Sequence, residues 1–246
     1  MTLPTELPAA PPGARRPYWI AIAVVLAALV AATFAWWLYA SQQAAERELA
    51  AKAELTRLGA LVVMDAQRKH VNSINLSTLK SPDSFDQAIA LLPALRRTKS
   101  LNLDGTPFRD EHAATIRRLT RLQDLVLSNT SITDATLEAI DGLSGLNTIH
   151  LANTNITNAG MPALGRLRSL KIVDISGTEV TGNLEPLCEF VDLNWLVAGR
   201  LTLDEAAFEA IGRCSSLTML SLGGSTFPRE ALDELVRKRP ALKIER

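Results

Sequence analysis

Residues 122–134 read LQDLVLSNTSITD, and variants of this stretch recur every 23 to 25 residues through the C-terminal half of the chain. The recurring first position is held by Thr98, Leu122, Leu146, Leu170, Leu193, Leu217 and Leu242. A fixed period of this size is typical of stacked repeat proteins, in which each unit packs mainly against its neighbours. Such a stack presents a continuous surface rather than one pocket, so the sequence favours binding over catalysis.

Two periodicities are present within each unit. Leu125 and Leu127 alternate with residues of the opposite face, as in a half-buried strand. Apolar residues spaced three apart then indicate one face of a short helix: Leu137, Ile140 and Leu143. Between these segments, Thr133 and Asp134 offer the side-chain oxygens that a helix start needs for its free N–H groups. Each unit is therefore predicted to be a strand, a turn, a short helix and a return loop.

A column of threonines follows the predicted strands, where the chain must turn. It comprises Thr106, Thr130, Thr154 and Thr178. A hydroxyl at this position can bond backbone groups of the turn, and the bond can repeat up the stack as a ladder. Leu201 takes this place in the fifth copy and Ser225 in the sixth. We interpret Leu201 as a local irregularity, with a specialised loop as the alternative.

The pattern Leu-x-x-Leu-x-Leu-x-x-Thr-x-Ile-Thr-Asp at residues 122–134 resembles the leucine-rich repeat family, in its bacterial variety with short convex helices. The resemblance covers residues 61–246. The family carries Asn or Cys where these copies mostly carry Thr. This departure bears on the subclass within the family and not on the fold. The resemblance implies an α/β repeat fold, a leucine-rich-repeat solenoid with a parallel concave sheet and short convex helices. It also implies a role in protein interaction, usually without catalysis.

Atypical units are expected at both ends, because a solenoid must cover its open ends. Residues 59–97 are predicted to form the N-terminal capping unit, in which β-type runs flank a polar turn at residues 65–69 and suggest a hairpin. A helix face follows with Phe85, Ile89, Leu92 and Leu95. Residues 98–246 are predicted to hold the repeats and the C-terminal cap. The last strand edge is protected there by charge, on Lys243, Glu245 and Arg246.

An uncharged run occupies residues 18–40 and is long enough to cross a bilayer, which takes about 20 apolar residues in a helix. Aromatic residues near both ends are typical of the membrane interfaces: Tyr18, Trp19, Trp36, Trp37 and Tyr39. A cleaved signal peptide is the alternative, but its apolar core would span only about 7–15 residues. We therefore predict an uncleaved transmembrane helix.

The segments on either side of this run differ in composition. Residues 1–17 contain five prolines and no apolar periodicity, so they are predicted to be a disordered tail. Residues 41–58 are rich in Ala, Gln, Glu, Arg and Leu, which favours a helical stalk. Pairing of two chains through this stalk is an alternative, although its apolar residues make no clean heptad.

Membrane orientation is predicted from Lys and Arg near the apolar run. Arg15 and Arg16 directly precede the run, and the basic residues that follow it nearly balance them. Proximity favours an N-terminus inside the cell, and long C-terminal domains translocate largely regardless of charge. We therefore predict a single-pass protein of the cell membrane whose repeat domain is extracytoplasmic.

Composition and cysteine positions set further bounds. The 246-residue chain carries 26 Lys plus Arg and 26 Asp plus Glu. Without a basic excess for phosphates, we expect no nucleic-acid partner. Cys214 aligns with a buried apolar column, whereas Cys188 aligns with Asp141 at an outer position. This register separates the two sulfurs, so the sequence predicts free thiols.

Candidate catalytic and metal-binding residues are dispersed. His70 falls in the predicted hairpin, His112 at a helix start and His150 in a strand. The Cys and His residues lack the spacing of a zinc site, and the sequence has no nucleophile elbow or phosphate-binding loop. We therefore expect no catalytic residue, no metal and no cofactor, and predict that the chain is not an enzyme.

Stacking places equivalent strand residues side by side on the concave face, pointing away from the core. The apolar ones form a single cluster on an otherwise polar sheet: Ile172, Trp195, Val197 and Met219. Gly199 and Gly223 are predicted to leave open space beside it. An exposed apolar patch centred on a tryptophan is typical of an interaction hot spot. Alternatively, Trp195 folds over its neighbours or lies beneath the C-terminal cap.

His150 and Asp174 are neighbours in one concave column. A hydrogen bond between them would favour the protonated imidazole and make binding sensitive to pH. A solvated surface pair of little consequence is the alternative.

The predicted function is that of a membrane-anchored leucine-rich-repeat module, which binds a protein partner through its concave face. Two alternatives remain: a structural or self-associating envelope protein, and a non-catalytic accessory subunit of a membrane complex. A glycan ligand also remains open, because Trp195 could stack on a sugar as well as on a protein side chain.

Overall fold

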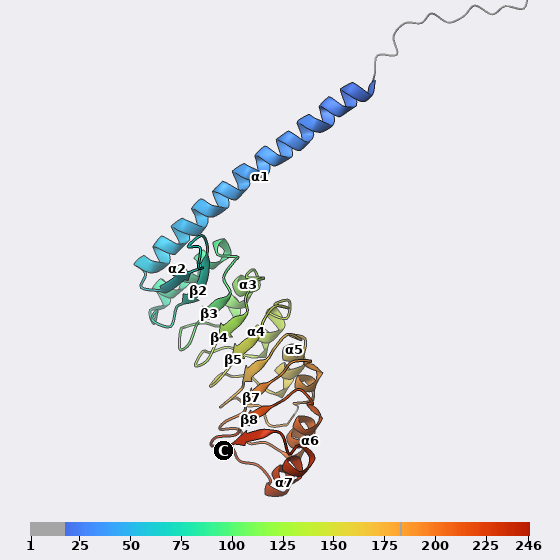
Figure 1. Ribbon diagram of the computed structural model, residues 1–246. Coiled ribbons are helices and arrows are strands. Elements are labelled where there is room, and N and C mark those ends of the chain that lie inside the picture. The colour runs from blue at the N-terminus through green and yellow to red at the C-terminus, as the bar shows by residue number, and fades with distance from the viewer. Residues whose placement is uncertain (1–17, 183) are drawn as a thin grey trace, which may run out of the picture. The chain divides into compact units, whose positions relative to one another are not determined.

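The computed structural model describes residues 18–182 and 184–246, so the tail predicted for residues 1–17 lies outside it. Its contacts divide the chain into two compact units, with the division between Glu46 and Arg47. The first unit contains most of helix α1, and the second contains the repeats (Figure 1).

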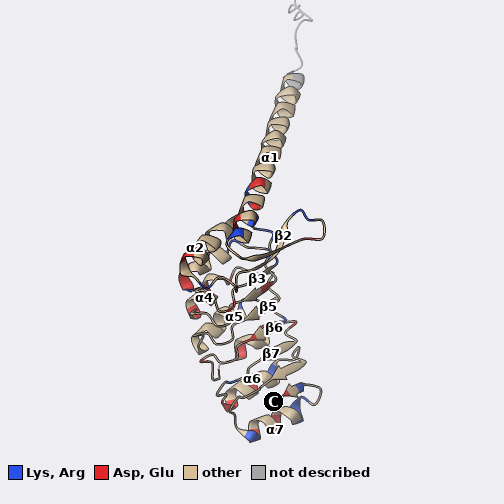
Figure 2. Ribbon diagram, turned by 90° about the vertical axis from the view of Figure 1, so that its left-hand side faces the viewer, with Lys and Arg blue, Asp and Glu red and all other residues tan. Residues whose placement is uncertain are grey.

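Helix α1 (Tyr18–Arg57) is continuous over 40 residues. From Ala21 onward, its most apolar 18-residue window has a mean hydropathy of 2.3, and none of that window is buried. Charged residues occur only in the C-terminal part of α1, as Figure 2 shows. A helix of this length and composition could cross a membrane. A signal sequence near an N-terminus has the same properties.

The last turns of α1 belong to the second unit and pack against it. Ala51 and Leu55, four residues apart on one helix face, are both buried. Glu48 on the same face accepts a hydrogen bond of 2.7 Å from the backbone N–H of Val71. The C-terminal part of α1 therefore helps to close the N-terminal end of the repeat core.

Strands β1 (Leu61–Met64) and β2 (Val71–Asn75) pair antiparallel, which confirms the predicted capping hairpin. Within the described ranges, nine strands form one sheet in sequence order, and every pairing after β1–β2 is parallel. The remaining strands are β3 (Ser100–Asn102), β4 (Asp124–Val126), β5 (Thr148–His150), β6 (Ile172–Asp174), β7 (Trp195–Val197), β8 (Met219–Ser221) and β9 (Lys243–Glu245). Each repeat of the sequence thus supplies one strand.

Short helices form the other layer of the repeat unit (Figure 1). The α-helices are α2 (Pro82–Leu91), α3 (Ala113–Ile116), α4 (Asp134–Ala139), α5 (Met161–Gly165), α6 (Glu205–Arg213) and α7 (Arg229–Lys238). The 3₁₀ segments are η1 (Leu92–Ala94), η2 (Asp110–His112), η3 (Asn158–Gly160) and η4 (Glu185–Glu189). The Thr133 side chain accepts a bond from the N–H of Ala135 at the start of α4, as the sequence predicts. The predicted fold class is confirmed.

The core lies between the sheet and the helices and runs through all the repeats. The middle residue of each strand from β3 to β8 is buried, and its two neighbours are partly exposed or exposed on the opposite face. Thr98, the residue that replaces the first leucine of the repeat, is also buried, and its hydroxyl has no hydrogen-bond partner among the described residues. The same alternation that buries the leucines therefore places the intervening side chains on the concave face.

The predicted threonine ladder is confirmed. Each of the four hydroxyls donates to the backbone carbonyl three residues earlier, at 2.6–2.7 Å. Leu201 has no hydroxyl and cannot make this bond. The hydroxyl of Ser225 in the next repeat donates to the carbonyl of Ala198 instead, at 2.6 Å. The Ser225 hydroxyl also accepts from the N–H of Leu201, at 3.0 Å. The irregularity at Leu201 is thus compensated by its neighbour.

A second ladder connects the helix starts of successive repeats. The carboxylate of Asp110 accepts from the N–H of Thr133 at 2.9 Å, and from the hydroxyls of Thr133 at 2.7 Å and Thr136 at 2.6 Å. Asp134 repeats the first two bonds with Thr157. Burial raises the pKa of the Asp110 carboxyl, but these hydrogen bonds lower it more, so the net pKa lies below its ordinary value.

Replacing Asp110 with Asn is expected to lower the free energy of unfolding by about 1 kcal/mol at neutral pH, because charge-assisted hydrogen bonds are lost from a partly solvated site. A carboxyl whose pKa is lower in the folded chain than in the unfolded chain stabilises the fold at pH values above its unfolded pKa of about 3.9. This stabilisation disappears as the pH falls through the pKa of the folded state. The difference between wild type and Asp110→Asn should therefore vanish in acid. Urea unfolding at several pH values measures it, with exposed Asp192→Asn as control. A pH-independent difference would contradict the role assigned to the charge.

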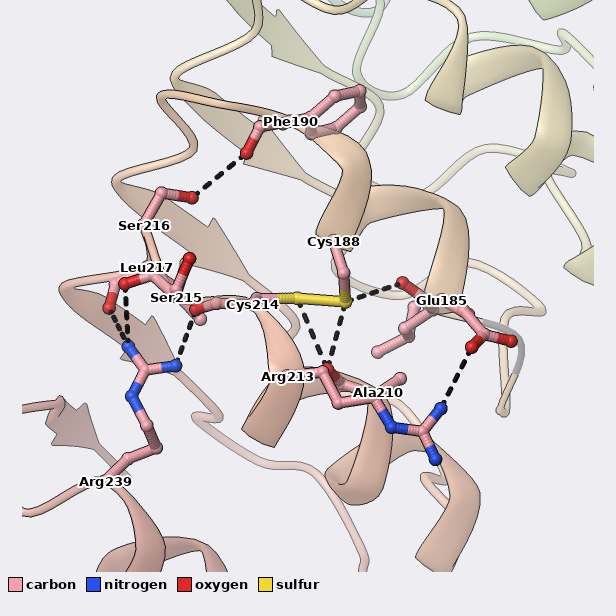
Figure 3. Close-up of a disulfide and its surroundings, with 11 residues drawn as sticks. Glu185, Cys188, Phe190, Ala210, Arg213, Cys214, Ser215, Ser216, Leu217 and Arg239 are labelled. Atoms are coloured by element: carbon pink, nitrogen blue, oxygen red, sulfur yellow. Dashed lines mark hydrogen bonds and ion pairs between the residues drawn. A yellow bond between two sulfur atoms is a disulfide. The ribbon is translucent and has the colours of Figure 1, made fainter.

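The two cysteines form a disulfide, so the prediction of free thiols is wrong. Cys188 lies in η4 and Cys214 directly follows α6, and their Cα atoms are 4.4 Å apart (Figure 3). The repeat that contains Cys188 is one residue shorter than its neighbours and has a 3₁₀ segment in place of an α-helix. Because a 3₁₀ helix has three residues per turn, alignment with Asp141 gives the wrong direction for this side chain.

The disulfide lies within a wider set of contacts between the last three repeats. Arg213 of α6 forms an ion pair of 2.9 Å with Glu185 of η4. The guanidinium of Arg239 donates to the carbonyls of Cys214 at 2.6 Å and Leu217 at 2.8 Å, as Figure 3 shows. The C-terminal cap thereby satisfies carbonyls that the end of α6 leaves without helical partners.

Candidate functional site

The concave face is built from two rows of side chains, one on each side of the buried middle residue. The strand register sets Ser100, Asp124, Thr148, Ile172, Trp195, Met219 and Lys243 in the first row. The second row contains Asn102, Val126, His150, Asp174, Val197, Ser221 and Glu245. Equivalent residues of successive repeats therefore lie side by side, as stacking predicts.

The predicted apolar residues come together on three adjacent strands, β6, β7 and β8. We call Ile172, Trp195, Val197 and Met219 the concave cluster. Trp195 pairs with Ile172 on one side and Met219 on the other. Val197 lies two residues from Trp195 on the same face, and the side chains other than Trp195 are half-buried. The cluster is a continuous apolar surface. It extends by about one strand spacing to either side of the indole.

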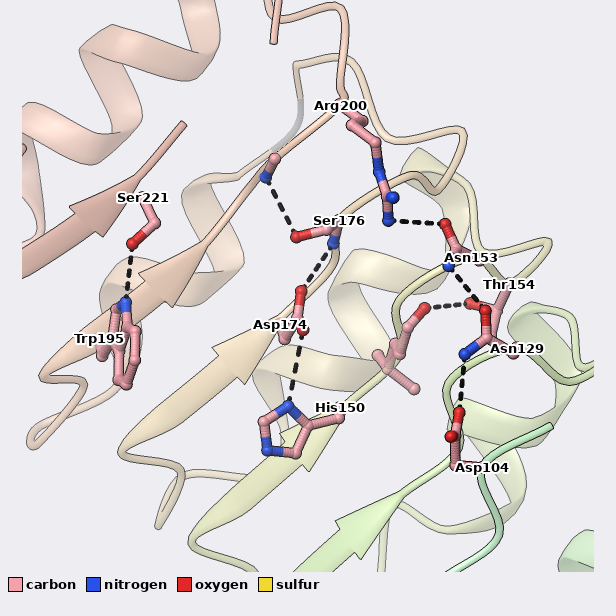
Figure 4. A network of polar contacts seen from close by, with 12 residues as sticks. Asp104, Asn129, His150, Asn153, Thr154, Asp174, Ser176, Trp195, Arg200 and Ser221 are labelled. Carbon is pink, nitrogen blue, oxygen red and sulfur yellow. Dashed lines mark hydrogen bonds and ion pairs between the residues drawn. The ribbon is translucent and has the colours of Figure 1, made fainter. Parts of the chain in front are cut away.

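The indole of Trp195 is held in place by a polar relay. Its Nε1–H donates to the hydroxyl of Ser221 at 3.1 Å, and that hydroxyl donates to the carboxylate of Glu245 at 2.9 Å. Figure 4 shows the indole and Ser221 on neighbouring strands. Trp195 is 36% exposed, so its neighbours cover much of the side chain but leave part of the indole accessible. The ring is therefore both accessible and fixed in orientation.

The two glycines beside the cluster differ. A Cβ added at Gly223 would meet nothing within 4 Å, so the predicted open space is present there. A Cβ at Gly199 would lie 2.9 Å from the carbonyl oxygen of Gly223, and Gly199 is buried. The predicted open space at Gly199 is therefore wrong: a tight contact between two neighbouring turns requires this glycine.

His150 and Asp174 lie next to each other in the second row, with 3.6 Å between Nδ1 and Oδ2 (Figure 4). Burial raises the pKa of the Asp174 carboxyl, but the adjacent His150 ring and hydrogen bonding from Ser176 lower it more, and the net pKa lies below its ordinary value. The backbone N–H of Ser176 contributes one of these bonds, at 2.9 Å. A carboxylate therefore borders the concave cluster at neutral pH, one strand from Val197.

A polar strip follows the turns at the end of the strands (Figure 4). Asn129 donates to Asp104 at 2.7 Å, and Asn153 donates to Asn129 at the same distance. Arg200 then reaches across the Gly177 turn and donates to Asn153 at 2.8 Å. The repeat pattern of leucines does not by itself predict this strip. In the sequence, the strip could have been recognised from residue types that tolerate a positive φ and recur once per repeat. These are Gly105, Asn129, Asn153, Gly177 and Gly224; Arg200 also has a positive φ but is not of such a type.

Substitution of Gly177 by Ala tests the geometry of this strip. Gly177 has a φ of +64°, and an added Cβ would lie 2.5 Å from the Asn153 amide oxygen that Arg200 binds. We expect a loss of about 1–2 kcal/mol in the free energy of unfolding. Gly223→Ala is the matched control, because open space surrounds that position. Equal urea-unfolding midpoints for the two variants would contradict this account of the turn.

The N-terminal end of the concave face has an apolar feature that the sequence analysis also missed. Leu61 and Val63 on β1 pair with Asn75 and Ser73 of β2, which places them in the same two rows. Both side chains are more than half exposed. The alternation in residues 61–64 could have predicted this exposure. Val62 and Met64 pack on the core, which leaves Leu61 and Val63 on the other face. The concave face thus has exposed apolar side chains on β1 as well as on β6, β7 and β8.

In residues 18–182 and 184–246, no three His, Cys, Asp or Glu side chains gather in a way that could hold a metal ion. His70, His112 and His150 lie on three different elements or turns, and the structure does not bring them together.

Comparison with known proteins gives a match to the leucine rich repeat family model over residues 120–180. Among solved structures, internalin C2 from Listeria monocytogenes is similar, with 19% identity and a TM-score of 0.54 over 75% of this chain and 88% of that one. An internalin (inlF) from the same organism has 21% identity and a TM-score of 0.51 over 63% of this chain. Curated proteins give no match to the sequence.

The likeness to the internalins concerns the fold, since identities are low. This chain spans 48% of the length of the internalin (inlF). The family match falls on the copies from which the repeat pattern was read, and the parallel sheet extends the same unit from Ser100 to Glu245. The repeat domain therefore has the fold of a leucine-rich-repeat solenoid, and residues 120–180 match the family itself.

Proposed function

We propose that this protein is a membrane-anchored, non-catalytic binding module, and that the concave cluster is its contact site for a protein partner. The observation that carries the proposal is the exposed but hydrogen-bonded indole of Trp195 at the centre of an apolar patch. Tryptophan is enriched among the residues that dominate binding energy, and such residues lie near the centre of an interface. The fold supports the same function, because a solenoid offers an extended concave surface to a partner.

Fixation of the indole before binding favours affinity. A side chain that must be ordered on binding costs about 0.5–1.5 kcal/mol. The bond from Trp195 to Ser221, itself held by Glu245, removes much of that cost in advance. The hydrogen bond uses only the Nε1–H at the edge of the ring, so it does not itself occupy the ring face.

The surroundings of the cluster indicate the chemistry of the partner. Asp174 presents a carboxylate beside Val197, and open space at Gly223 allows a side chain to approach from the turn side. We propose that the partner presents an apolar or aromatic side chain to Trp195 and a hydrogen-bond donor or cation to Asp174. His150 pairs with the same carboxylate, so protonation of His150 would compete with that donor.

The membrane part of the proposal rests on α1 and on the disulfide. We propose that residues 18–40 span the cell membrane, with the N-terminus inside and the repeats outside. The length and hydropathy of α1 support the span. Disulfides persist mainly in oxidising compartments, so Cys188–Cys214 supports an extracytoplasmic repeat domain.

Site-specific photo-crosslinking in the native cell tests the binding proposal. A photoreactive residue is placed at Val197 in the cluster, with a control at exposed Glu138 on the helical face. We expect one discrete protein adduct at Val197 and none at Glu138. Adducts of equal intensity at both positions, or a glycan at Val197, would contradict a dedicated protein partner on the concave cluster.

Self-association is a second candidate function, favoured by the N-terminal sheet edge. Strand β1 is an edge strand without charge or proline, and Leu61 and Val63 on it are exposed. Natural proteins usually protect such edges, as Lys243 and Glu245 do at β9. The oligomeric state of the full-length protein, compared with that of Val63→Lys, decides whether copies associate through β1.

A further inference from the structure

The positive charges of this net-neutral chain are concentrated on one edge of the sheet. Residues 95–99 and 117–123 lead into β3 and β4, and each segment carries three Lys or Arg and no Asp or Glu. The turns at the opposite edge differ: residues 103–111 contain three acidic residues and one basic residue. Because parallel strands all begin at the same edge, these two basic segments lie on the same side of the sheet.

The basic segments lie next to one another in space. The backbone N–H of Lys99 donates to the carbonyl of Asn72 at 2.8 Å, and that of Gln123 donates to the carbonyl of Lys99 at 2.7 Å. The tip of the capping hairpin, with Arg68 and Lys69, precedes β2 at the same edge. We call residues 68–69, 95–99 and 117–123 the basic edge.

Asp65 partly compensates the charge of Lys69, whose backbone N–H donates to its carboxylate at 2.7 Å. All Lys and Arg side chains of the basic edge are exposed. Within the described part of the chain, none of them forms an ion pair with a carboxylate, although Arg97 contacts the ring of His70. Surface charges of both signs are normally interspersed, so a one-signed strip indicates an anionic partner.

The covalent link between the apolar run and the hairpin tip is short. Glu48 of α1 bonds Val71 and lies 3.0 Å from His70, directly beside the hairpin tip. Glu48 follows Ala40, the last residue of the apolar run, by eight residues, which in an α-helix is a rise of about 12 Å at most. The headgroup layer occupies about 5–8 Å of that distance, and Lys and Arg side chains can extend across the rest.

We propose that the basic edge binds the phosphates of anionic phospholipids in the bilayer that holds α1. This rests on the membrane span put forward under the proposed function. The contact adds a second attachment beside the helix and thereby limits how the solenoid tilts over the membrane. Each Lys or Arg near an anionic surface contributes about a fivefold factor to the docked population.

The test uses the full-length protein in nanodiscs of phosphatidylcholine, with or without phosphatidylglycerol. The native cysteines are joined, so a maleimide fluorophore labels only an introduced cysteine. Gln67→Cys places the fluorophore at the hairpin tip, and Ser131→Cys places it in an exposed turn of the opposite edge. Quenching by a headgroup spin-labelled lipid reports contact with the bilayer.

We expect strong quenching at position 67 that needs phosphatidylglycerol and weakens with salt, and weak quenching at position 131 in both lipids. Lys69→Gln with Arg96→Gln should lower the docked-to-free ratio by about 25-fold. Arg237→Gln with Arg246→Gln removes the same charge elsewhere and should leave the ratio unchanged. Quenching at 67 that is equal in both lipids, or unchanged in the Lys69→Gln/Arg96→Gln variant, would overturn the proposal. Failure of the protein to enter nanodiscs would instead overturn the membrane span.

Discussion

Reduction of the Cys188–Cys214 disulfide is expected to lower the free energy of unfolding of the C-terminal repeats by about 3.5 kcal/mol. The bond joins residues 26 apart, and closing a loop of that length removes this much conformational entropy from the unfolded chain. The local structure increases the need for the bond. The repeat with Cys188 has a 3₁₀ segment in place of an α-helix, and short 3₁₀ segments have weaker hydrogen-bond geometry.

Urea unfolding followed by far-UV circular dichroism, with and without reductant, measures this loss. The control is Cys188→Ser with Cys214→Ala, where the second change avoids a hydroxyl at a buried position. Reductant should shift the wild-type midpoint to that of the variant and leave the variant itself unchanged. A wild-type shift below about 1 kcal/mol would mean that the ion pair of Arg213 with Glu185 and the contacts of Arg239 hold these repeats together without the disulfide.

The same bond gives an independent measurement of topology. In intact cells, a thiol reagent should label the protein only after reduction if the repeats lie in an oxidising compartment. Labelling without prior reduction would place the repeats in a reducing compartment and reverse the proposed orientation of α1. This measurement does not depend on the identity of the partner.

Much of the fold was accessible from the sequence because one short pattern is repeated. The spacing from Leu122 to Leu146 sets one strand per repeat, and the parallel register then follows for every concave row. Trp195 and Met219 could be paired in this way without any structural information. The helical segments were less predictable, because their phase changes in the short repeat with η4, and this change brings Cys188 to Cys214.

The remaining features depend on contacts that a repeat alignment does not contain. Gly199 looked like open space, yet the turn at Gly223 packs against it. Ala51 and Leu55 read as ordinary helix formers, and only their packing assigns them to the core. Arg200 bonds Asn153 two repeats away, a contact that the spacing within one repeat does not reveal. In each case the neighbour is set by the three-dimensional stack rather than by the local pattern.

Replacing Trp195 with Ala is expected to weaken partner binding by at least about 30-fold, which corresponds to the 2 kcal/mol that defines a hot-spot residue. The physical reason is loss of the largest apolar surface in the concave cluster, which no neighbour can replace. Folding should be little affected, because Trp195 is 36% exposed and the buried Leu196 beside it is unchanged. The affinity of the crosslinked partner for the full-length protein in nanodiscs measures the effect.

Two further variants separate the contact from its pre-organisation. Ser221→Ala removes the acceptor of the indole N–H but leaves the ring, so binding should weaken only by the cost of ordering one side chain, about two- to tenfold. Val191→Ala, at a highly exposed position outside the concave rows, should leave affinity unchanged. If Trp195→Ala changes affinity by less than twofold, or if Val191→Ala weakens binding equally, the partner does not use the concave cluster. If Ser221→Ala weakens binding as much as Trp195→Ala does, the fixed orientation of the indole, more than its apolar area, determines affinity.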